Sequence, residues 1–543
     1  MMSAAGPAYV YVESNNLSVG QNAVLAFLRD PLTGGLTQIG SFSAGGTGGA
    51  NVQDSDQEVV ASRDGRFLFT VNQGSRSIAS FRVASDGSLA RIGTFDSGGA
   101  EPVTIGLAGN RLYVGNRGGS GLAPNYTGFT VAADGSLTPI QGSTVSLPAG
   151  LIPAQPLVSR DGQLVFGDNF GSSSSTDSSL NNTIEPFRIA GDGTLQLAPS
   201  GAVSAGSGGL LGFATHPTQR IVYAGLASAR AVGVFTYDAN GSVTFVRSAP
   251  DRGSAICWLV TSADGRFLYV ANTGSDTIGV YSLADPLDPV QIQEFQLGGI
   301  LAPPGSPTGT RQTADYQIAL DPSGRWLYVV GQSGNAAFQQ GNALHVLSVR
   351  QDGTVSEPNS PVQFSAADVP AGTRPQGVAV VNPLGAGSIS GTVFNDANNN
   401  AVRDVGEGGL AGVVVYLDLN QDGKLDPGEP TATTDVNGNY TFANVLDGSY
   451  VVREATPTGY RRTTPDAGGI AVTVSNDQPA AGPVFGEVKI SSVVLDFSYL
   501  LKLAANYGRP ATFATGDLDG DGSAGFDDLV LLARNYGHAL PTN

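Results

Sequence analysis

Residues 58–95 read EVVASRDGRFLFTVNQGSRSIASFRVASDGSLARIGTF, and their pattern continues to about Val381. An apolar strand leads into an Asp-Gly turn at Asp64 and Gly65, and a strand of aromatic and β-branched residues follows. A polar turn and a third strand with alternating apolar positions complete the unit. Residues 258–283 repeat it as WLVTSADGRFLYVANTGSDTIGVYSL, so the sequence predicts antiparallel hairpins in series.

Weaker copies bring the number of units to six and begin at Val103, Pro156, Gly212 and Ile318. A seventh unit is divided between distant parts of the chain: residues 8–13 and 23–39 supply its middle and outer strands, and residues 375–381 its inner strand. Four short strands per unit are typical of a β-propeller, and pairing the two ends covers the edge strands of the ring. We therefore expect a mainly β chain with a seven-bladed β-propeller over residues 1–383.

The composition supports a turn-rich protein with several cores. The chain has 543 residues, of which 75 are glycine, 31 are proline and only 14% are charged. Its net charge of −18 disfavours nucleic acid and anionic lipid as partners and favours cations. No apolar stretch is long enough for a membrane helix, so we expect no membrane insertion.

Two further features concern the cellular compartment. Cys257 is the only cysteine, which excludes an intrachain disulfide and a cysteine-based zinc cluster. Residues 1–9 lack the charged and apolar regions of a secretory signal. Because the acidic loops described below indicate an extracellular or cell-surface protein, we expect that this N-terminus is incomplete.

The propeller resembles the seven-bladed lactonase family, which includes bacterial 6-phosphogluconolactonases and fungal muconate-lactonizing enzymes. The resemblance rests on the strings DGRFLFTVN and DGRFLYVAN and on the DGSL outer turns at residues 86–89 and 134–137. It implies lactone hydrolysis at the mouth of the central channel. Where the family carries polar groups around a His-Pro turn, this chain keeps His216-Pro217 but has the apolar runs 209–211 and 225–227.

Lactone opening needs a base or an oriented water, and donors for the developing oxyanion. The catalytic candidates that remain near the predicted channel end are Glu58, Arg311, Gln317 and Arg374, with Glu101, Tyr316 and Gln376 beside them. Such a ring is suited to a small sugar-like ligand. Three functions stay open: a ligand-binding or partner-binding scaffold, an extracellular lactone hydrolase with a modified channel, and adhesion through loops such as 171–182. Structural roles are the alternative for His216 and for Asn72, Asn116 and Asn272, which suit turns of the repeat.

Two acidic loops with EF-hand ligand spacing follow the linker at residues 383–388. In the second loop the ligand positions are Asp418, Asn420, Asp422, Lys424, Asp426 and Glu429, and Gly423 occupies the sixth position. The first loop offers Asp396, Asn398, Asn400, Val402, Asp404 and Glu407, with Ala401 in place of the glycine. Alternating oxygen ligands around a sharp turn predict Ca²⁺ binding, weaker in the first loop; the alternative is a solvated acidic turn.

The strands around these loops resemble the calcium-binding B-type module of serine-aspartate-repeat surface proteins. That resemblance covers residues 387–486 and implies a small β-sandwich that acts as a rigid spacer. Calcium loops of extracellular modules bind at about 10⁻⁴ to 10⁻³ M, so they fill outside the cell.

The C-terminal residues 487–543 contain a third loop. Its ligand positions are Asp517, Asp519, Asp521, Ser523 and Asp528, with Gly522 at the sixth position. The loop leads into an amphipathic helix, FDDLVLLARNYG, and LDFSYLLKLAANYG from Leu495 is an earlier copy of that helix. The pair resembles a dockerin, an EF-hand-type helical module, which implies a cohesin-like or cell-surface partner. Lys489 and Ser491 stand where a first dockerin loop needs carboxylates, so we expect one Ca²⁺ in this tail.

Overall fold

The fold was obtained as a computed structural model, which divides the chain into two compact units, Met2–Leu384 and Gly385–Asn543. The structure describes residues 8–30, 33–50, 55–171, 178–206, 208–298, 313–333, 341–381, 387–418, 423–425, 429–445, 448–465, 469–474, 479–489, 492–519 and 521–541. Strands dominate both units, as the sequence predicts, and the described helices include none that is long and apolar enough to span a membrane.

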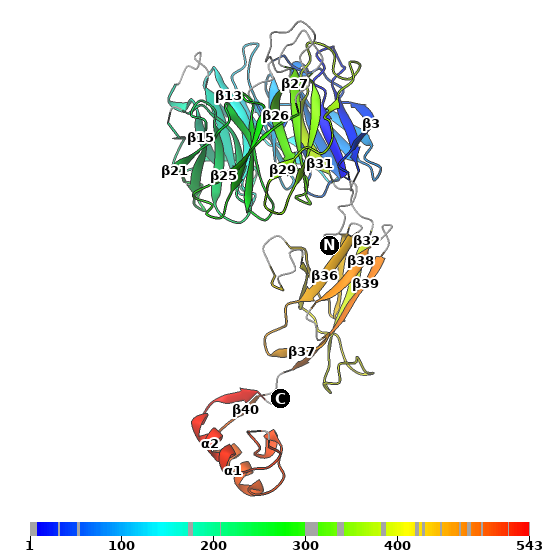
Figure 1. The fold of residues 1–543 in the computed structure, drawn as a ribbon, viewed down its shortest axis with the longest axis vertical. Helices are drawn as coiled ribbons and strands as arrows, with labels where there is room; N and C mark the ends of the chain where they lie inside the picture. Colours follow the sequence, from blue (N-terminus) through cyan, green and yellow to red (C-terminus); the bar gives the residue numbers. More distant parts are fainter. Residues whose placement is uncertain are drawn as a thin grey trace. The chain divides into compact units, whose positions relative to one another are not determined.

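The first unit consists of seven antiparallel sheets, the blades of a propeller (Figure 1). From the innermost strand outward, the first three blades are β31 (Gln376–Val381), β1 (Ala8–Glu13), β2 (Ala23–Arg29) and β3 (Leu36–Ser43); β4 (Val59–Ala61), β5 (Phe67–Asn72), β6 (Ser77–Val83) and β7 (Leu89–Asp96); and β8 (Pro102–Ala108), β9 (Arg111–Asn116), β10 (Asn125–Val131) and β11 (Leu137–Pro139), with β12 (Val145–Ser146) beside β10. A 3₁₀ turn, η1 (Gln73–Ser75), lies between β5 and β6.

The remaining four blades repeat this order. They are β13 (Leu151–Val158), β14 (Leu164–Gly171), β15 (Thr183–Ile189) and β16 (Leu195–Leu197), with η2 (Ser178–Leu180) and β17 (Val203–Ser204); β18 (Leu210–Thr215), β19 (Ile221–Leu226), β20 (Ala231–Tyr237) and β21 (Val243–Pro250); β22 (Ile256–Thr261), β23 (Phe267–Asn272), β24 (Thr277–Ser282) and β25 (Val290–Gln296); and β26 (Thr313–Leu320), β27 (Trp326–Ser333), β28 (Ala343–Val349) and β29 (Val355–Ser356), with β30 (Val362–Gln363).

The ring closes through the first blade, which the two ends of the propeller sequence build together. Strand β31 pairs with β1 in antiparallel register, with Val10 opposite Val380. The predicted divided blade is therefore confirmed. A buried ion pair strengthens the same junction, because the guanidinium of Arg29 on β2 lies 3.2 Å from Asp321 of the seventh blade and also stacks on Trp326.

Glycines in the outer turns allow neighbouring blades to approach closely. Gly87 has a φ of +78°, and a Cβ on it would lie 2.2 Å from the ring of Tyr9 in the preceding blade. Gly34, with a φ of +72°, stands in the same relation to Trp326, so it joins the first blade to the seventh. The other blade junctions of this kind pair Gly135 with Phe67, Gly193 with Ile140, Gly241 with Leu164 and Gly353 with Phe267.

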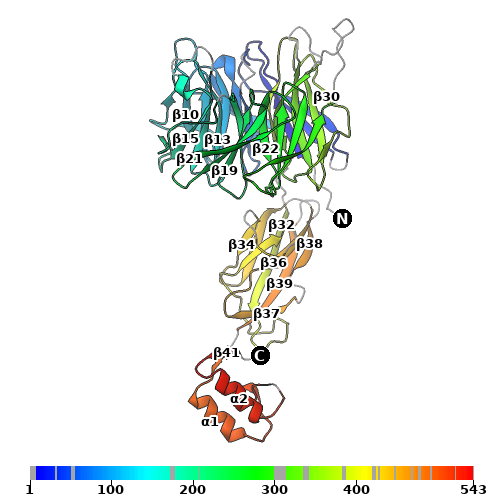
Figure 2. The same cartoon turned by 60° about the vertical axis from the view of Figure 1, so that its left-hand side comes forward.

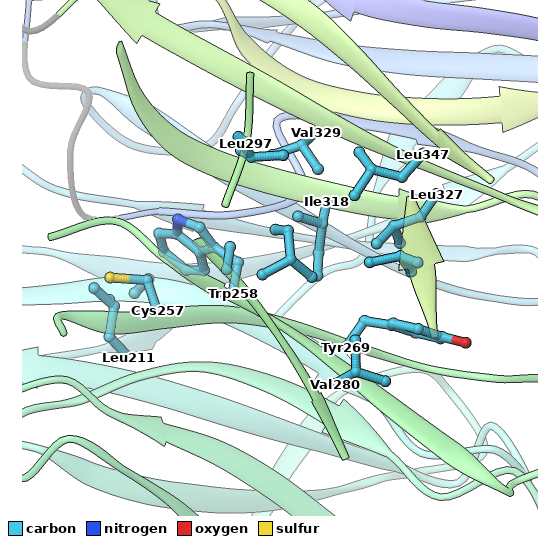
Figure 3. Close-up of a cluster of buried hydrophobic side chains, with 14 residues drawn as sticks. Leu211, Cys257, Trp258, Tyr269, Val280, Leu297, Ile318, Leu327, Val329 and Leu347 are labelled. Atoms are coloured by element: carbon cyan, nitrogen blue, oxygen red, sulfur yellow. The ribbon is translucent and has the colours of Figure 1, made fainter. Parts of the chain in front are cut away.

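Apolar side chains fill the space between blades. Figure 3 shows one such cluster, in which Trp258 of the sixth blade packs with Ile318 and Val329 of the seventh. The single cysteine, Cys257, is buried in the same cluster and acts there as a small apolar side chain. Each blade therefore buries both of its faces against its neighbours.

The second unit begins with a β-sandwich of two four-stranded sheets (Figure 2). One sheet contains β35 (Asn439–Val445), β32 (Gly387–Asn395), β39 (Pro479–Lys489) and β37 (Tyr460–Thr464); the other contains β34 (Thr431–Thr433), β33 (Val414–Asp418), β36 (Gly448–Glu454) and β38 (Ile470–Val474). Lys489, which the sequence places in a decayed tail loop, is the last residue of β39.

The C-terminal tail contains two short helices, as the sequence predicts: α1 (Phe497–Asn506) and α2 (Phe526–Arg534). A 3₁₀ turn, η3 (Phe513–Thr515), separates them, and β40 (Ser492–Val494) pairs with β41 (Ala539–Pro541). Tyr499 and Leu503 of α1 pack with Leu532 of α2 in a small core.

Replacing Gly34 by Ala tests the closure of the ring. The new Cβ would collide with the fixed ring of Trp326 and impose a positive φ on alanine, so we expect a loss of about 2 kcal/mol or more in the free energy of unfolding of the propeller. Gly109→Ala is the matched control, because Gly109 also has a positive φ, +59°, but has open space around it. Urea unfolding measures both variants, and equal losses would contradict a role for the close contact.

Candidate functional site

The innermost strands of the seven blades form a closed ring around the central channel. In order around the ring, neighbouring innermost strands are β31, β4, β8, β13, β18, β22 and β26, and β26 contacts β31 again. Residues at the start of these strands therefore face one another across the channel mouth, although they are far apart in the sequence.

A short segment just before β4 crosses this mouth. The amide of Asp56 donates to the carbonyl of Ala154 on β13 at 3.1 Å, and the carbonyl of Gln57 accepts from Ile105 on β8 at 3.0 Å. On the other side, the amide Nε2 of Gln317 on β26 donates to the carbonyl of Ser55 at 2.9 Å. The segment 55–58 is thus anchored to blades on opposite sides of the ring.

Glu58 and Gln317, two of the predicted catalytic candidates, meet at this segment. Gln317 Nε2 lies 3.2 Å from Glu58 Oε1, which also accepts from the hydroxyl of Ser55 at 2.9 Å. Both side chains are fully buried, and Glu58 Oε2 and Gln317 Oε1 have no hydrogen-bond partner among the described residues. Burial raises the pKa of Glu58 well above its usual value, and the nearby charge of Asp56 adds to the effect.

The other predicted channel residues lie apart from this pair. Arg374 is half-buried just before β31 and forms no ion pair with Glu58, while Gln376 is buried opposite Glu13. Glu101 is half-buried just before β8. Arg311 and the side chain of Tyr316 lie outside the described residues.

Three further buried carboxyl groups near the mouth were missed by sequence reasoning. Burial raises the pKa of Glu13 to about 8, although a hydrogen bond from Asn22 lowers it, and burial raises the pKa of Asp56 to about 7. Burial also raises the pKa of Asp168 well above its usual value. The signal was present for Glu13, which ends the second strand of its blade where other blades have asparagine, as at Asn72.

The expected structural roles of His216 and the asparagines agree with the geometry. His216 Nδ1 accepts from the amides of Thr218 and Gln219 in its own turn. Asn72 Nδ2 donates to the carbonyl of Ala44 at 3.1 Å. These side chains hold turns of their blades in place and are not available as a catalytic base.

The channel mouth therefore has an unusual chemistry for an ester hydrolase. Because their pKa values are raised, Glu58 and its neighbours lose their protons at a higher pH than usual, which limits them as bases. No Lys or Arg of the described chain forms an ion pair with Glu13, Asp56, Glu58 or Asp168. The described residues thus pair no cation with this cluster that could hold an anionic ligand such as a phosphorylated sugar, and neutral or cationic ligands are favoured.

The three acidic loops of the second unit share one local geometry. In each, the carboxylate at the first ligand position accepts a hydrogen bond from the amide at the sixth: Asp396 from Ala401 at 2.8 Å, Asp418 from Gly423 at 3.0 Å and Asp517 from Gly522 at 3.0 Å. The residue at the sixth position has a positive φ in all three, between +63° at Ala401 and +88° at Gly522. This explains why the ligand pattern calls for glycine there.

The first loop is ordered throughout by its own predicted ligands. Asp404 Oδ2 accepts from the amide groups of both Asn398 and Asn400, at 2.8 and 2.7 Å. Glu407 at the twelfth position accepts from the backbone of Ala397 at 2.8 Å, which draws the end of the loop over its start. Val402 has no side-chain oxygen, so its backbone carbonyl is the group that it would offer to an ion at the seventh position.

The third loop gathers carboxylates most closely. Oxygen atoms of Asp517, Asp519 and Asp521 lie within 4.8 Å of one another. Asp528 at the twelfth position accepts from the backbone amides of Asp519 at 3.0 Å and Gly525 at 2.6 Å, and Ser523 donates to Asp521 at 2.8 Å. Such a set of hard oxygen ligands fits a Ca²⁺ ion.

The second loop is described only in part. Asn420, Asp422 and Asp426 lie outside the described residues, while Gly423, Lys424 and Glu429 are exposed or half-buried. Asp418 is buried, and its Oδ2 forms an ion pair of 2.5 Å with Arg453 of β36.

Comparison with known proteins follows this division of the chain. Residues 8–149 and 212–331 match the family model "Lactonase, 7-bladed beta-propeller". A periplasmic gluconolactonase from Pseudomonas aeruginosa has a TM-score of 0.53 and 20% identity, covering 70% of this chain and 100% of that one. A protein from Bacteroides fragilis, named as a candidate 6-phosphogluconolactonase, has a TM-score of 0.53 and 16% identity over 69% of this chain and 98% of that one. At these identities the structures share the fold alone.

Residues 387–495 match the SdrD B-like domain model. The chain thus matches a seven-bladed lactonase propeller model in its first part and an SdrD B-like domain model in its second. Serine-aspartate repeat-containing protein D of Staphylococcus aureus strain Newman is 37% identical over 92 residues, 17% of this chain and 7% of that protein. Protein C of strain N315 is 40% identical over 76 residues, 14% of this chain and 8% of that protein. The chain therefore covers less than a tenth of these relatives.

Buried carboxyl groups make the lactonase propeller sensitive to pH. A carboxyl group whose pKa is raised in the folded state binds its proton more tightly there, so the free energy of unfolding falls as pH rises from the unfolded pKa to the folded one. For Glu13 this window runs from about pH 4.5 to about pH 8. We expect Glu13→Gln, which keeps the hydrogen bond from Asn22, to reduce this decrease by about 1.4 kcal/mol for each unit of the pKa shift.

Urea unfolding at several pH values, followed by tryptophan fluorescence, measures this decrease, because both tryptophans lie in the propeller. Asp134→Asn is the control: Asp134 is exposed, and hydrogen bonds from Ser136 lower its pKa. An unchanged pH dependence in Glu13→Gln would show that Glu13 ionises normally in the folded protein.

Proposed function

We propose that this chain is a secreted or cell-surface modular protein. In this proposal the lactonase propeller binds a small sugar-like ligand or a partner, the SdrD B-like domain is a calcium-stabilised spacer, and the dockerin-like tail attaches the protein to a cohesin-like or cell-surface partner. The observation that carries the proposal is the common geometry of the acidic loops, in which Asp396, Asp418 and Asp517 are held by the sixth amide of their loops.

The residues present support calcium as the ion. The first and third loops offer only oxygen ligands, and they place a carboxylate at the first and last positions, Asp396 with Glu407 and Asp517 with Asp528. A bound ion would neutralise carboxylates that otherwise repel one another, as in the third loop, where Asp528, Asp521 and Asp517 raise the pKa of Asp519 against the lowering hydrogen bond from the Asp521 backbone.

Calcium should therefore stabilise the second unit. At ten times its dissociation constant, each filled loop adds about 1.4 kcal/mol to the free energy of unfolding. We expect calorimetry of the full chain to show that EDTA lowers the transitions of this unit, and that Asp517→Asn and Asp396→Asn each remove part of the calcium effect. Asp435→Asn, in an exposed turn of the same sandwich, is the control. Unfolding transitions whose temperatures change neither with calcium nor with EDTA would refute the proposal.

Lactone hydrolysis is a second candidate function, which the match to the lactonase model favours. Because the channel mouth is acidic, we expect any turnover to be at least tenfold faster with neutral sugar lactones than with phosphorylated ones. Glu58→Gln and Arg374→Ala should reduce that turnover. A screen with pH-indicator detection measures it, and rates equal to the background for every lactone would exclude the enzyme.

A further inference from the structure

The channel mouth combines buried carboxyl groups with oxygen atoms that lack hydrogen-bond donors. Within the part of the chain that the structure describes, one carboxylate oxygen each of Glu58, Glu13 and Asp168 has no partner, and neither has the amide oxygen of Gln317. Glu58, Gln317 and Asp168 are 0% exposed, and Glu13 is 1% exposed. A buried acceptor without a donor costs about 1 to 3 kcal/mol, so several in one place call for a compensating group.

The charges within the cluster indicate which charge the compensating group should carry. The charge of Asp56 acts on Glu58 and on Asp168, and the charge of Glu13 acts on Glu58. As stated above, the described residues provide these carboxyl groups with no ion pair. A bound cation would meet both needs, because it would give the unpartnered oxygens a partner and offset the like charges.

The spacing of polar atoms around Glu58 fits a coordination shell. Two oxygens bound to one Ca²⁺ at about 2.4 Å, and separated by about 72 to 90 degrees at the ion, lie about 2.8 to 3.4 Å apart. Ser55 Oγ lies 2.9 Å from Glu58 Oε1, and the Gln317 amide lies 2.9 Å from the Ser55 carbonyl and 3.2 Å from Glu58 Oε1. A half turn of the amide would replace its nitrogen with the unpartnered oxygen.

We propose that the propeller holds a hard divalent cation, Ca²⁺, at the channel mouth between Ser55, Glu58 and Gln317. Glu58 supplies the carboxylate, Gln317 its amide oxygen, and Ser55 its carbonyl and hydroxyl oxygens. The ion would join β26 to the segment before β4. Strands β26 and β4 are not neighbours in the ring, because β31 lies between them. The ion would thereby fix the segment that crosses the channel.

The test counts calcium on the full-length chain. Protein stripped of metal with EDTA is dialysed against CaCl₂, and bound calcium is measured by mass spectrometry. We expect Glu58→Gln to bind one ion fewer than the wild type, since the acidic loops are present in both. Glu185→Gln is the matched control: Glu185 is a buried glutamate on β15 whose Oε2 is held by Asn169 at 2.8 Å. It should bind as many ions as the wild type.

A second measurement reports on the propeller alone. Trp258 and Trp326 are the only tryptophans of the chain, so thermal unfolding followed by their fluorescence does not sense the acidic loops. Calcium should raise this midpoint in the wild type and in Glu185→Gln, and not in Glu58→Gln. If Glu58→Gln does not fold, Gln317→Leu provides the same comparison, with an expected loss of at least tenfold in calcium affinity at the propeller.

Two results would overturn the proposal: equal calcium counts in the wild type and Glu58→Gln, or a wild-type propeller midpoint that does not respond to calcium. Neither result bears on the loops of the second unit, whose calcium response is measured in other transitions. Failure of the channel site is therefore distinguishable from failure of the proposed function.

Discussion

The propeller depends on close contact between outer turns and the neighbouring blade, which the absence of a Cβ permits at six of its seven blade junctions. At Gly34 this contact is with Trp326, whose other neighbour is the guanidinium of Arg29. Arg29 in turn forms the buried ion pair with Asp321. A single junction thus combines a close backbone approach, a cation–π contact and a charge pair, at the place where the two ends of the propeller sequence meet. It reinforces the closure that β31 and β1 make by pairing, and without that pairing the ring would be an open array with exposed edges.

Closure also determines the chemistry of the channel. Once seven innermost strands meet in a ring, a side chain at their ends can be buried by residues from several blades. Glu58 illustrates the consequence: it follows a short crossing segment, contacts Gln317 from another blade, and is fully buried. The raised pKa of Glu58 is therefore a result of the ring, because the same glutamate on an isolated hairpin would be solvated.

The sequence predicts what is local. The Asp-Gly turns, the divided blade and the two tail helices all follow from short patterns, and the loop at Asp517 places its carboxylates together because they are neighbours in the chain. The channel could be predicted only as a set of strand ends. Glu58 and Gln317 are 259 positions apart, and no local pattern shows that they touch while Arg374 does not pair with Glu58. Glu13 was missed because it extends an apolar strand, where it reads as the end of a repeat rather than as a channel group.

The acidic loops and the channel mouth both contain carboxyl groups, but the pKa values of Asp396 in the first loop and Glu58 in the mouth are shifted in opposite directions. Burial raises the pKa of Asp396, but hydrogen bonds from Thr463 and from the backbone of Ala401 outweigh it and lower the pKa, so the loop presents a charged oxygen to any ion that arrives. Glu58 has few such donors, and burial favours its protonated form. A cation at the loops adds to charges that already exist, whereas a cation in the channel must replace a proton. Because the pKa of Glu58 is raised and that of Asp396 is lowered, calcium binding at the propeller should release more protons than calcium binding at the first loop.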